Sequence, residues 1–544
     1  MVPPLQLPVT MMETEPLTWP TRIVDEGQAK NSFASQILEL ELDDDEILLF
    51  DSLTRAAKAL EQGELTACGH AAKSVQVRVA GGWVRDKLLG LSTHDVDVAL
   101  DTCTGVEFAH IVKDYLSNAI KQHQQDNVEP TKRICGKIGV IAANPAQSKH
   151  LETATMKVHG IEVDFSNLRH ETYATDSRIP TTVIGTPSED SFRRDFTMNA
   201  LYYNLHTQQV EDWTRRGLQD LLQNKLLVTP LDAFQTFHDD PLRVLRAIRF
   251  AVRFDMRLAE ELMRASMDYQ IHTELHRKVS RERVGKELEG MLSGKHADPQ
   301  KALQMICDLR LAGGVFCMPP PNIQIRGTIG QAHLDPVPYI GETVEDLSHL
   351  RQLAWEESRE CLTTLKDILD VFPKQNKNQS FTDPRLVFLA TFLLPFEHLQ
   401  YEDKTKVKYV AEYMMREGIK FKNTDVQAII TMTQNLDDMI RLLQRLPEAS
   451  PAVRLQAGLI VRNVKELWVT LLIVATVNLT RRKTADTAVD WCKRSHDWYQ
   501  TILHDLHLDE CWKVKPLMNG QELIKELGLE KGPQVGLYNQ QQLY

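Results

Sequence analysis

Two glycines and two aspartates lie close enough in the sequence to bind a nucleotide and a metal together. Gly81 and Gly82 follow a predicted strand and precede a predicted helix, and glycines at such a turn let the backbone approach a bulky anion. Asp95 and Asp97 lie in the next predicted strand, where residues two apart project from one face. Carboxylates at this spacing can share a pair of Mg²⁺ ions.

Each half of this pattern is common by itself, because a Gly-Gly pair is usually only a turn and an Asp-x-Asp usually a solvated strand face. Their succession within one strand-turn-helix-strand unit favours a functional site. Arg85, in the first turn of the helix, would lie near the bound anion. For a third metal carboxylate we choose Glu162 over Asp164 on the same strand face, and an ordinary edge-strand acid is the alternative.

Two later segments carry further polar groups. In Arg193-Arg194-Asp195, Arg194 and Asp195 could hold the triphosphate or ribose of a nucleotide, and a helix start with charged flanks is an equally good interpretation. In the helix that follows, Asp240 suits the N-cap and Pro241 the first position.

That helix is predicted to have two faces. One is apolar and consists of Val244, Leu245, Ala247, Ile248, Ala251 and Val252. Beside it runs a stripe of Arg243, Arg246, Arg249 and Arg253. A stripe of arginines without acids between them indicates an anion-binding surface, although an ordinary exposed basic face has the same pattern.

The elements that must position these residues change character along the chain. From about Val75 to Leu227, alternating strands and helical stretches predict an α/β domain. From about Asp232 onward, apolar residues recur at helical spacing, which predicts a helical assembly. The apolar stretch Leu467–Leu479 is too short to cross a bilayer and predicts a buried helix.

Net charge at first argues against a nucleic-acid partner. The 544 residues carry a formal charge of −11. The first 51 residues account for −9 of it, with eleven acidic and two basic side chains, so the rest of the chain is nearly neutral. Eight scattered cysteines without a Cys-x-x-Cys pair predict reduced thiols rather than disulfides or a zinc ribbon.

These residues together resemble the class II tRNA nucleotidyltransferases, the CCA-adding enzymes, in their eukaryotic form, within the DNA polymerase beta-like nucleotidyltransferase superfamily. The matching motifs occur in the family's order between Val75 and Leu292: Gly81-Gly-x-Val-Arg-Asp with Asp95-x-Asp97, Arg193-Arg-Asp-Phe-Thr-x-Asn-Ala, Asp212–Asp220, Asp239-Asp-Pro-Leu-Arg-Val-Leu-Arg and Arg283-Val-Gly-Lys-Glu-Leu. The resemblance implies a palm-like α/β nucleotidyltransferase head followed by an all-α neck, body and tail. The corresponding segments are 1–60 (an acidic N-terminal extension and first helix), 61–227 (head), 228–310 (neck, with the nucleotide-selecting motif) and 311–544 (tRNA-binding body and tail).

The resemblance also implies a reaction and its site residues. The 3′-hydroxyl of a tRNA attacks the α-phosphate of CTP or ATP, and diphosphate leaves. Asp95 and Asp97 are the expected catalytic residues and hold two Mg²⁺ ions, with Glu162 as third ligand. The expected nucleotide-binding residues are Gly81, Gly82, Arg85, Arg194, Asp195, Asp240, Arg243, Arg246 and Arg249.

Protein side chains select the base in this family, which here implies Asp239, Asp240 and Arg243. Asp240 only accepts hydrogen bonds and suits the exocyclic amine of cytosine or adenine, whereas Arg243 only donates and suits the neighbouring ring nitrogen. Uracil and guanine present the opposite pattern. The family commonly has Glu where Asp239 stands, so we place more weight on Asp240.

Two other functions compete with this interpretation. A poly(A) polymerase of the same superfamily would use the same aspartates and add many A residues, and a catalytically silent tRNA-binding protein would lack the intact motifs. The expected partners are tRNA, CTP and ATP, with no membrane and no obligate protein partner. tRNA maturation implies nucleus and cytosol. The Pro-rich opening does not resemble a transit peptide, so mitochondria would be reached through later starts at Met11 or Met12.

Overall fold

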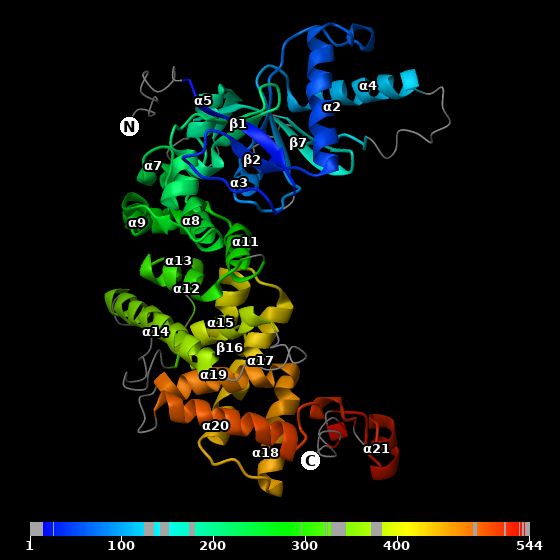
Figure 1. Ribbon diagram of the computed structural model, residues 1–544. Helices are drawn as coiled ribbons and strands as arrows, with labels where there is room; N and C mark the ends of the chain where they lie inside the picture. Colours follow the sequence, from blue (N-terminus) through cyan, green and yellow to red (C-terminus); the bar gives the residue numbers. More distant parts are fainter. Residues whose placement is uncertain are drawn as a thin grey trace. The chain divides into compact units, whose positions relative to one another are not determined.

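The computed structural model divides the chain into two compact units, Met1–Val279 and Ser280–Tyr544 (Figure 1). The described residues are 15–25, 27–123, 135–141, 152–172, 180–294, 296–320, 323, 325–327, 344–371, 383–481, 487–515, 518–532, 534–535 and 538. The boundary between the units falls inside the predicted neck, so α7–α10 belong to the first unit and the later helices to the second.

A mixed sheet forms the centre of the first unit. Its nine described strands are β1 (Leu17–Val24), β2 (Leu38–Glu41), β3 (Val77–Ala80), β4 (Val96–Leu100), β5 (Gly139–Ile141), β6 (Thr153–Val158), β7 (Ile161–Asn167), β10 (Leu201–Asn204) and β11 (Gln209–Asp212). They are ordered β2-β1-β11-β10-β3-β4-β7-β6-β5. Only the β1–β2 and β4–β7 pairs are parallel. A separate hairpin consists of β8 (Arg169–Thr172) and β9 (Thr181–Ile184).

Helices connect and cover these strands: α2 (Asp44–Glu61), α3 (Gly82–Leu88), α4 (Gly105–His123), α5 (Pro187–Phe192) and α6 (Gly217–Gln219). Helix α2 packs against α4 and also contacts β3 and β7 (Figure 1). The α/β head that the sequence predicts is therefore confirmed.

The acidic N-terminal segment is part of this head. Strand β1 pairs with β11, and β2 pairs with β1, so the boundary predicted at residue 60 does not separate them from the sheet. Glu46 is fully buried, where it accepts hydrogen bonds from Trp83 Nε1 at 2.9 Å and from Lys87 Nζ at 2.6 Å. Asp43 and Glu46 also form a capping box at the start of α2. Several acidic side chains of this N-terminal segment thus have structural partners.

Four helices complete the first unit: α7 (Ala233–Asp239), α8 (Leu242–Arg253), α9 (Glu260–Ser266) and α10 (Tyr269–Lys278). A short parallel pair, β12 (Leu226–Leu227) with β13 (Arg257–Leu258), ties the end of the head to the turn after α8. The six apolar residues predicted for one face of α8 are all buried, which confirms that face.

The second unit is largely helical. Its α-helices are α11 (Arg281–Leu292), α12 (Pro299–Asp308), α13 (Ala312–Val315), α14 (Val344–Val371), α15 (Pro384–Phe392), α16 (Val410–Tyr413), α17 (Asn423–Leu443), α18 (Pro451–Val464), α19 (Trp468–Arg481), α20 (Ala488–Gln500) and α21 (Gly520–Leu527). A small sheet of β14 (Ile325–Arg326), β15 (Gln400–Asp403) and β16 (Lys406–Tyr409) is the exception to the all-α prediction.

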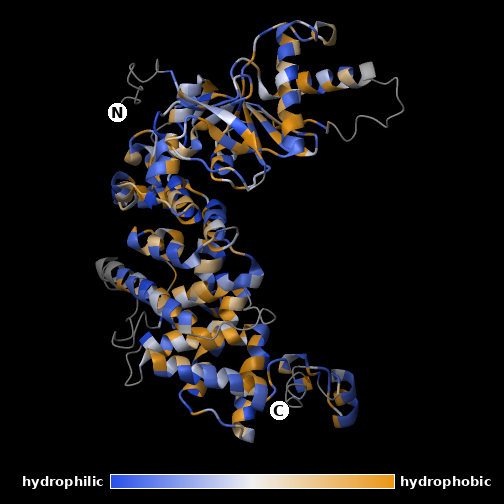
Figure 2. Cartoon of the chain, viewed as in Figure 1, coloured by the Kyte–Doolittle hydropathy of each residue, from blue (hydrophilic) through white to orange (hydrophobic). Residues whose placement is uncertain are grey.

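Helix α19 lies at the centre of the second unit, where it contacts α14, α15, α17, α18 and α20. It contains most of the apolar stretch Leu467–Leu479, which confirms the predicted buried helix. In Figure 2 hydrophobic and hydrophilic residues alternate along the helices of both units, as amphipathic packing requires. Within the described part of the chain, no helix is both long and apolar enough to span a membrane.

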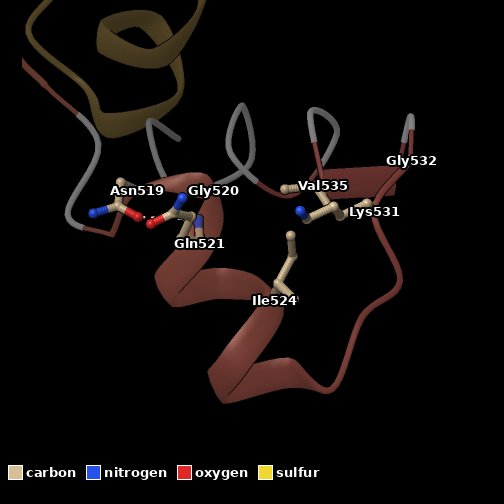
Figure 3. A pocket seen from close by; sticks show the side chains of 7 residues that line it. All are labelled: Asn519, Gly520, Gln521, Ile524, Lys531, Gly532 and Val535. Carbon is tan, nitrogen blue, oxygen red and sulfur yellow. Dashed lines mark hydrogen bonds between the residues drawn. The ribbon is translucent and has the colours of Figure 1, made fainter.

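The tail ends in a small recess beside α21. Asn519 caps this helix by accepting from the backbone N–H of Gln521 and Glu522, and Gly528 ends it at φ +63°. The recess has a volume of about 500 Å³ and is lined by Asn519, Gly520, Gln521, Ile524, Lys531, Gly532 and Val535 (Figure 3). None of the predicted site residues lines it.

Candidate active site

The turn between β3 and α3 requires glycine at one of its two positions. Gly81 has φ +64°, and a Cβ there would lie only 2.7 Å from Arg194 Nη1 and 3.2 Å from the Asn199 carbonyl oxygen. A Cβ on Gly82 would meet nothing closer than Arg85 Nη2 at 3.7 Å, an ordinary contact. Gly81 therefore lets the Arg194 guanidinium lie directly over the turn.

The two predicted catalytic aspartates lie at the start of β4. Asp97 faces solvent in this strand, and Asp95 immediately precedes it, also exposed. The parallel pairing of β4 with β7 places Asp97 opposite Asp164. Although Asp97 is exposed at the surface, the protein packed around it displaces part of its water and raises its pKa to about 6, and the charges of Asp95 and Asp164 contribute to the rise. Three carboxylates thus share one face of the sheet.

Glu162 lies two residues before Asp164 on the same face of β7. Its partner across the antiparallel β6 is Lys157, and it lines a recess of about 350 Å³ that also includes Asp43, Asp45 and His94. The strand register thus pairs Asp164, and not Glu162, with Asp97. The role of Glu162 stays a prediction, and Asp164 is a second candidate because it lies opposite Asp97.

A buried carboxylate organises the arginines beside the turn. Asp190, in α5, is 1% exposed and accepts hydrogen bonds from Arg193 at 2.6 and 2.9 Å and from Arg194 at 2.8 and 3.1 Å. The backbone N–H of Arg169 and the hydroxyl of Tyr202 donate to it as well. Burial alone would raise the pKa of Asp190, but the two guanidinium charges hold it well below its usual range.

Arg194 is fixed at both ends of its guanidinium. On one side of the guanidinium, Nη2 donates to Asp190. On the other side, Nη1 donates to the Asn199 carbonyl oxygen at 3.1 Å, beside Gly81. Its Cζ lies 5.1 Å from the centre of the Tyr202 ring. The structure therefore brings Arg194 and Gly81 together, as the sequence predicts.

Asn199 connects the other predicted residues in a chain. Its Nδ2 donates to Asp195 at 2.9 Å, and its Oδ1 accepts from Arg85 Nη1 at 2.5 Å. Asp195 also accepts from Arg246 Nε at 2.8 Å, while Arg85 Nε donates to Asp86 at 2.7 Å. Because the Arg85 residue is only 5% exposed, the structure places it as an internal brace and not at an open anion site.

The arginine stripe on α8 does not stand free of acids. Arg246 pairs with Asp195, and Arg253 Nη2 lies 3.3 Å from Asp86, acids that other elements supply. Arg243 Nη2 donates to the Arg193 carbonyl oxygen at 2.8 Å. The guanidinium groups of Arg85, Arg246 and Arg249 also lie 4.8–5.2 Å from the centre of the Phe250 ring. The sequence predicted the stripe but not these partners, which are distant in the chain.

The two predicted base-selecting aspartates lie at the junction of α7 and α8. Asp239 ends α7 and accepts from Gln235 Nε2 at 2.7 Å, and burial raises its pKa. Asp240 has an extended backbone and its Oδ1 accepts from the Leu242 N–H at 3.3 Å. Helix α8 begins at Leu242, one residue later than predicted, with Pro241 as N-cap. Asp240 and Arg243 are both half-buried.

The Asp212–Asp220 motif joins this site to the rest of the head. Asp212 and Asp220 are buried, and Asp220 accepts from Thr197 Oγ1 at 2.8 Å. A Cβ on Gly217 would lie 2.5 Å from the Thr197 carbonyl oxygen, so this position has no room for a side chain. The motif thus packs directly on the segment that carries Asn199.

Sequence reasoning missed Asp190, the group with the most partners in the site. A signal was present, because Asp190 precedes Arg193 and Arg194 by three and four residues, the spacing of side chains that meet on a helix. The contact of this carboxylate with Tyr202 has no such signal in the sequence.

We expect Asp190→Asn to lower the free energy of unfolding by about 3 kcal/mol, because it leaves two buried guanidinium groups without their counterion. The folded-state pKa of Asp190 is depressed, so its stabilisation is present above the unfolded pKa of about 3.9 and is lost as the pH falls further. Urea unfolding at several pH values should therefore show the two proteins converging below about pH 4. Asp51→Asn, in an exposed pair with Arg55, is the control and should cost less than about 1 kcal/mol. A pH-independent difference would contradict the charge argument.

Comparison with known proteins agrees with this geometry. The family profile described as "Poly A polymerase head domain" matches residues 77–227. The mitochondrial CCA tRNA nucleotidyltransferase of Saccharomyces cerevisiae is 34% identical over 475 residues, which cover 85% of this chain and 83% of that protein. The tRNA nucleotidyltransferase cca1 of Schizosaccharomyces pombe is 31% identical over 92% of both chains.

Solved structures share the fold. A CCA-adding enzyme in complex with CTP aligns with a TM-score of 0.54 at 20% identity, over 92% of this chain and 90% of that one. The Thermotoga maritima CCA-adding enzyme in complex with tRNA aligns with a TM-score of 0.53 at 20% identity, over 91% and 89%. They extend the similarity of fold over both units. From the identity and coverage of its relatives, the chain belongs to the CCA tRNA nucleotidyltransferase family.

Proposed function

We propose that this protein adds C, C and A to the 3′ end of tRNA, using CTP and ATP, without a nucleic-acid template and with release of diphosphate. The observation that carries the proposal is the arrangement in one unit of three carboxylates, a glycine turn covered by Arg194, and a half-buried acceptor and donor, Asp240 and Arg243. Relatives that match most of the chain bear the name of this activity.

The carboxylate face fits a hard divalent cation. Asp95, Asp97 and Asp164 offer oxygen ligands of the kind that Mg²⁺ prefers, and desolvation together with the charges of Asp95 and Asp164 raises the pKa of Asp97, an effect that a bound cation would oppose. Among the described residues, no three acidic, histidine or cysteine side chains already stand at metal-binding spacing, so the fit rests on donor type and charge. Bound Mg²⁺ would lower the pKa of the attacking hydroxyl and neutralise charge on the leaving diphosphate.

The nucleotide is held by residues of the head and of α8. Arg194 lies over the Gly81 turn, where a phosphate could approach the backbone. Asp195 is bonded to Arg246, and Arg249 lies one turn further along α8, so these side chains can contact ribose and triphosphate. Arg85 contributes through Asn199, since its own guanidinium is buried.

The base is read by one acceptor and one donor. Asp240 can accept from the exocyclic amine of cytosine or adenine, and Arg243 can donate to the adjacent ring nitrogen. The contact of Arg243 with the Arg193 carbonyl engages one of its five N–H groups, and the others can donate to a base. UTP and GTP would leave buried polar groups unpaired, at about 1–3 kcal/mol each.

The relatives' names bear on localisation as well. Two of them are called mitochondrial, and we propose that this protein serves tRNA in nucleus and cytosol, with mitochondria supplied through starts at Met11 or Met12. Strand β1 begins only at Leu17, so these starts leave the described sheet intact.

The reaction is tested with tRNA that lacks its last three nucleotides, offered each nucleoside triphosphate singly and in pairs. We expect CTP alone to give two additions, and CTP with ATP to give three additions and then a stop. A long A tract would instead identify a poly(A) polymerase, and binding without any addition would identify a silent tRNA-binding protein.

The identity of the third carboxylate is tested by a matched pair of variants on β7. Asp164→Ala should lower kcat at least about 100-fold, because it removes a group opposite Asp97. Glu162→Ala should stay within a few-fold of wild type. Asp95→Ala serves as the reference for complete loss, and tRNA binding should persist in all three. The reverse order of the two β7 variants would restore Glu162 as the ligand.

Base selection is tested by Asp240→Ala, which should reduce the preference for CTP over UTP by at least about tenfold in kcat/KM, through loss of the acceptor. Asp239→Ala should change it less, since the Asp239 carboxylate is already held by Gln235. An unchanged preference in Asp240→Ala would mean that the base is chosen elsewhere.

A further inference from the structure

The segment that carries Asp239 and Asp240 is held by the end of helix α10. Helix α7 ends at Asp239, and the last carbonyl groups of a helix lack partners within it. Lys278 Nζ donates to one of these carbonyls, that of His238, at 3.2 Å. A cation at a helix C-terminus satisfies a carbonyl and also complements the helix dipole. Lys278 is thus a cap for α7, supplied by another helix.

This lysine is buried and has a buried counterion. Its side chain is 4% exposed, and Glu274, one turn earlier in α10, is 6% exposed with Oε1 3.4 Å from Lys278 Nζ. The same oxygen lies 2.8 Å from His238 Nδ1 and accepts from Gln270 Nε2 at 3.3 Å. Glu274 therefore holds the side chain of His238, while Lys278 holds its backbone.

The cluster extends to the base-selecting residues. The His238 ring lies nearly parallel to that of Phe234, with ring centres 6.1 Å apart and planes 9° apart, a second contact that restricts its orientation. The charges of His238, Lys278 and Arg243 all act on the Asp239 carboxylate, against the effect of burial on its pKa. The buried groups of α10 are thus in electrostatic contact with the α7–α8 junction.

Stability alone does not account for these buried charges. Glu274 Oε2 is buried and has no hydrogen-bond partner among the described residues, so the carboxylate is desolvated without full compensation. Buried ion pairs of this kind are often no more stabilising than apolar side chains of the same volume. Their directional contacts, by contrast, restrict where the end of α7 can lie.

We infer that Lys278 and Glu274 are positioning residues for base selection. The inference rests on the proposed function, in which Asp240 and Arg243 read the base. Asp240 directly follows the end of α7, and Arg243 lies in the first turn of α8, so the position of the α7 end sets the distance between acceptor and donor. Hydrogen bonds weaken steeply with distance and angle, so a small shift of Asp240 would weaken the distinction between correct and incorrect bases.

Lys278→Met tests the inference, because methionine keeps an apolar chain and removes the cation. We expect the preference for CTP over UTP in kcat/KM to fall about tenfold, with KM for CTP rising more than kcat falls and tRNA affinity unchanged. Lys278→Arg should restore much of the preference. Glu274→Gln, a second variant that keeps the shape of the side chain, should shift the preference in the same direction.

The matched control is Lys58→Met, which removes an exposed lysine from α2, outside every motif, and should leave the preference unchanged. Asp240→Ala in the same assay tests whether Asp240 reads the base, independently of the positioning role of Lys278. If Asp240→Ala relaxes selection and Lys278→Met does not, the inference is overturned and the proposed function stands. If Asp240→Ala changes nothing, the base is chosen elsewhere, and the inference falls while the addition reaction is still judged by its own assay. If Lys278→Met lowers kcat/KM equally for all four nucleoside triphosphates and also lowers the melting temperature, α10 only supports the fold and the inference is overturned.

Discussion

One buried charge cluster determines the geometry of the nucleotide-binding side of the head. Two adjacent arginines, Arg193 and Arg194, converge on the single carboxylate of Asp190, which is inaccessible to water. Without that carboxylate their repulsion and desolvation would drive the guanidinium groups apart. With it, Arg194 lies over the Gly81 turn, and the carbonyl of Arg193 is in place to accept from Arg243. The carboxylate of Asp190 thus holds the Gly81 turn through Arg194 and helix α8 through Arg193.

The same principle recurs throughout the site. Asp195 is bonded to Arg246, Asp86 to Arg85 and Arg253, and Glu274 to Lys278. The Asp195–Arg246 and Asp86–Arg253 pairs join elements that are far apart in the sequence, whereas the Asp86–Arg85 and Glu274–Lys278 pairs each lie within one helix. These bonds orient the arginines before a substrate binds. A triphosphate would meet a preorganised cluster, which reduces the entropy lost on binding.

The sequence predicted local features well and long-range pairing poorly. The order of the motifs, the buried face of α8 and the glycine turn follow from periodicity and residue type, which act over a few residues. The choice between Glu162 and Asp164 depends on the register of β7 against β4, and nothing within β7 records which residue of β4 it faces. The N-terminal strands were missed for the same reason, since the pairing of β1 with β11 is not visible near β1. Net charge averaged the acidic segment with the rest of the chain and concealed its contact with Lys87.

The place of β1 in the sheet affects how the protein emerges from the ribosome. Thr21 of β1 bonds to Gln208, which is 187 residues later, so β1 can pair with β2 early but meets β11, its other neighbour, only after most of the head has been synthesised. Until then the nascent chain presents unpaired strand edges, the feature that most readily recruits other chains. The acidic residues that follow β1 give the N-terminal segment a strong negative charge. Repulsion between the segments of two nascent chains would oppose their premature association.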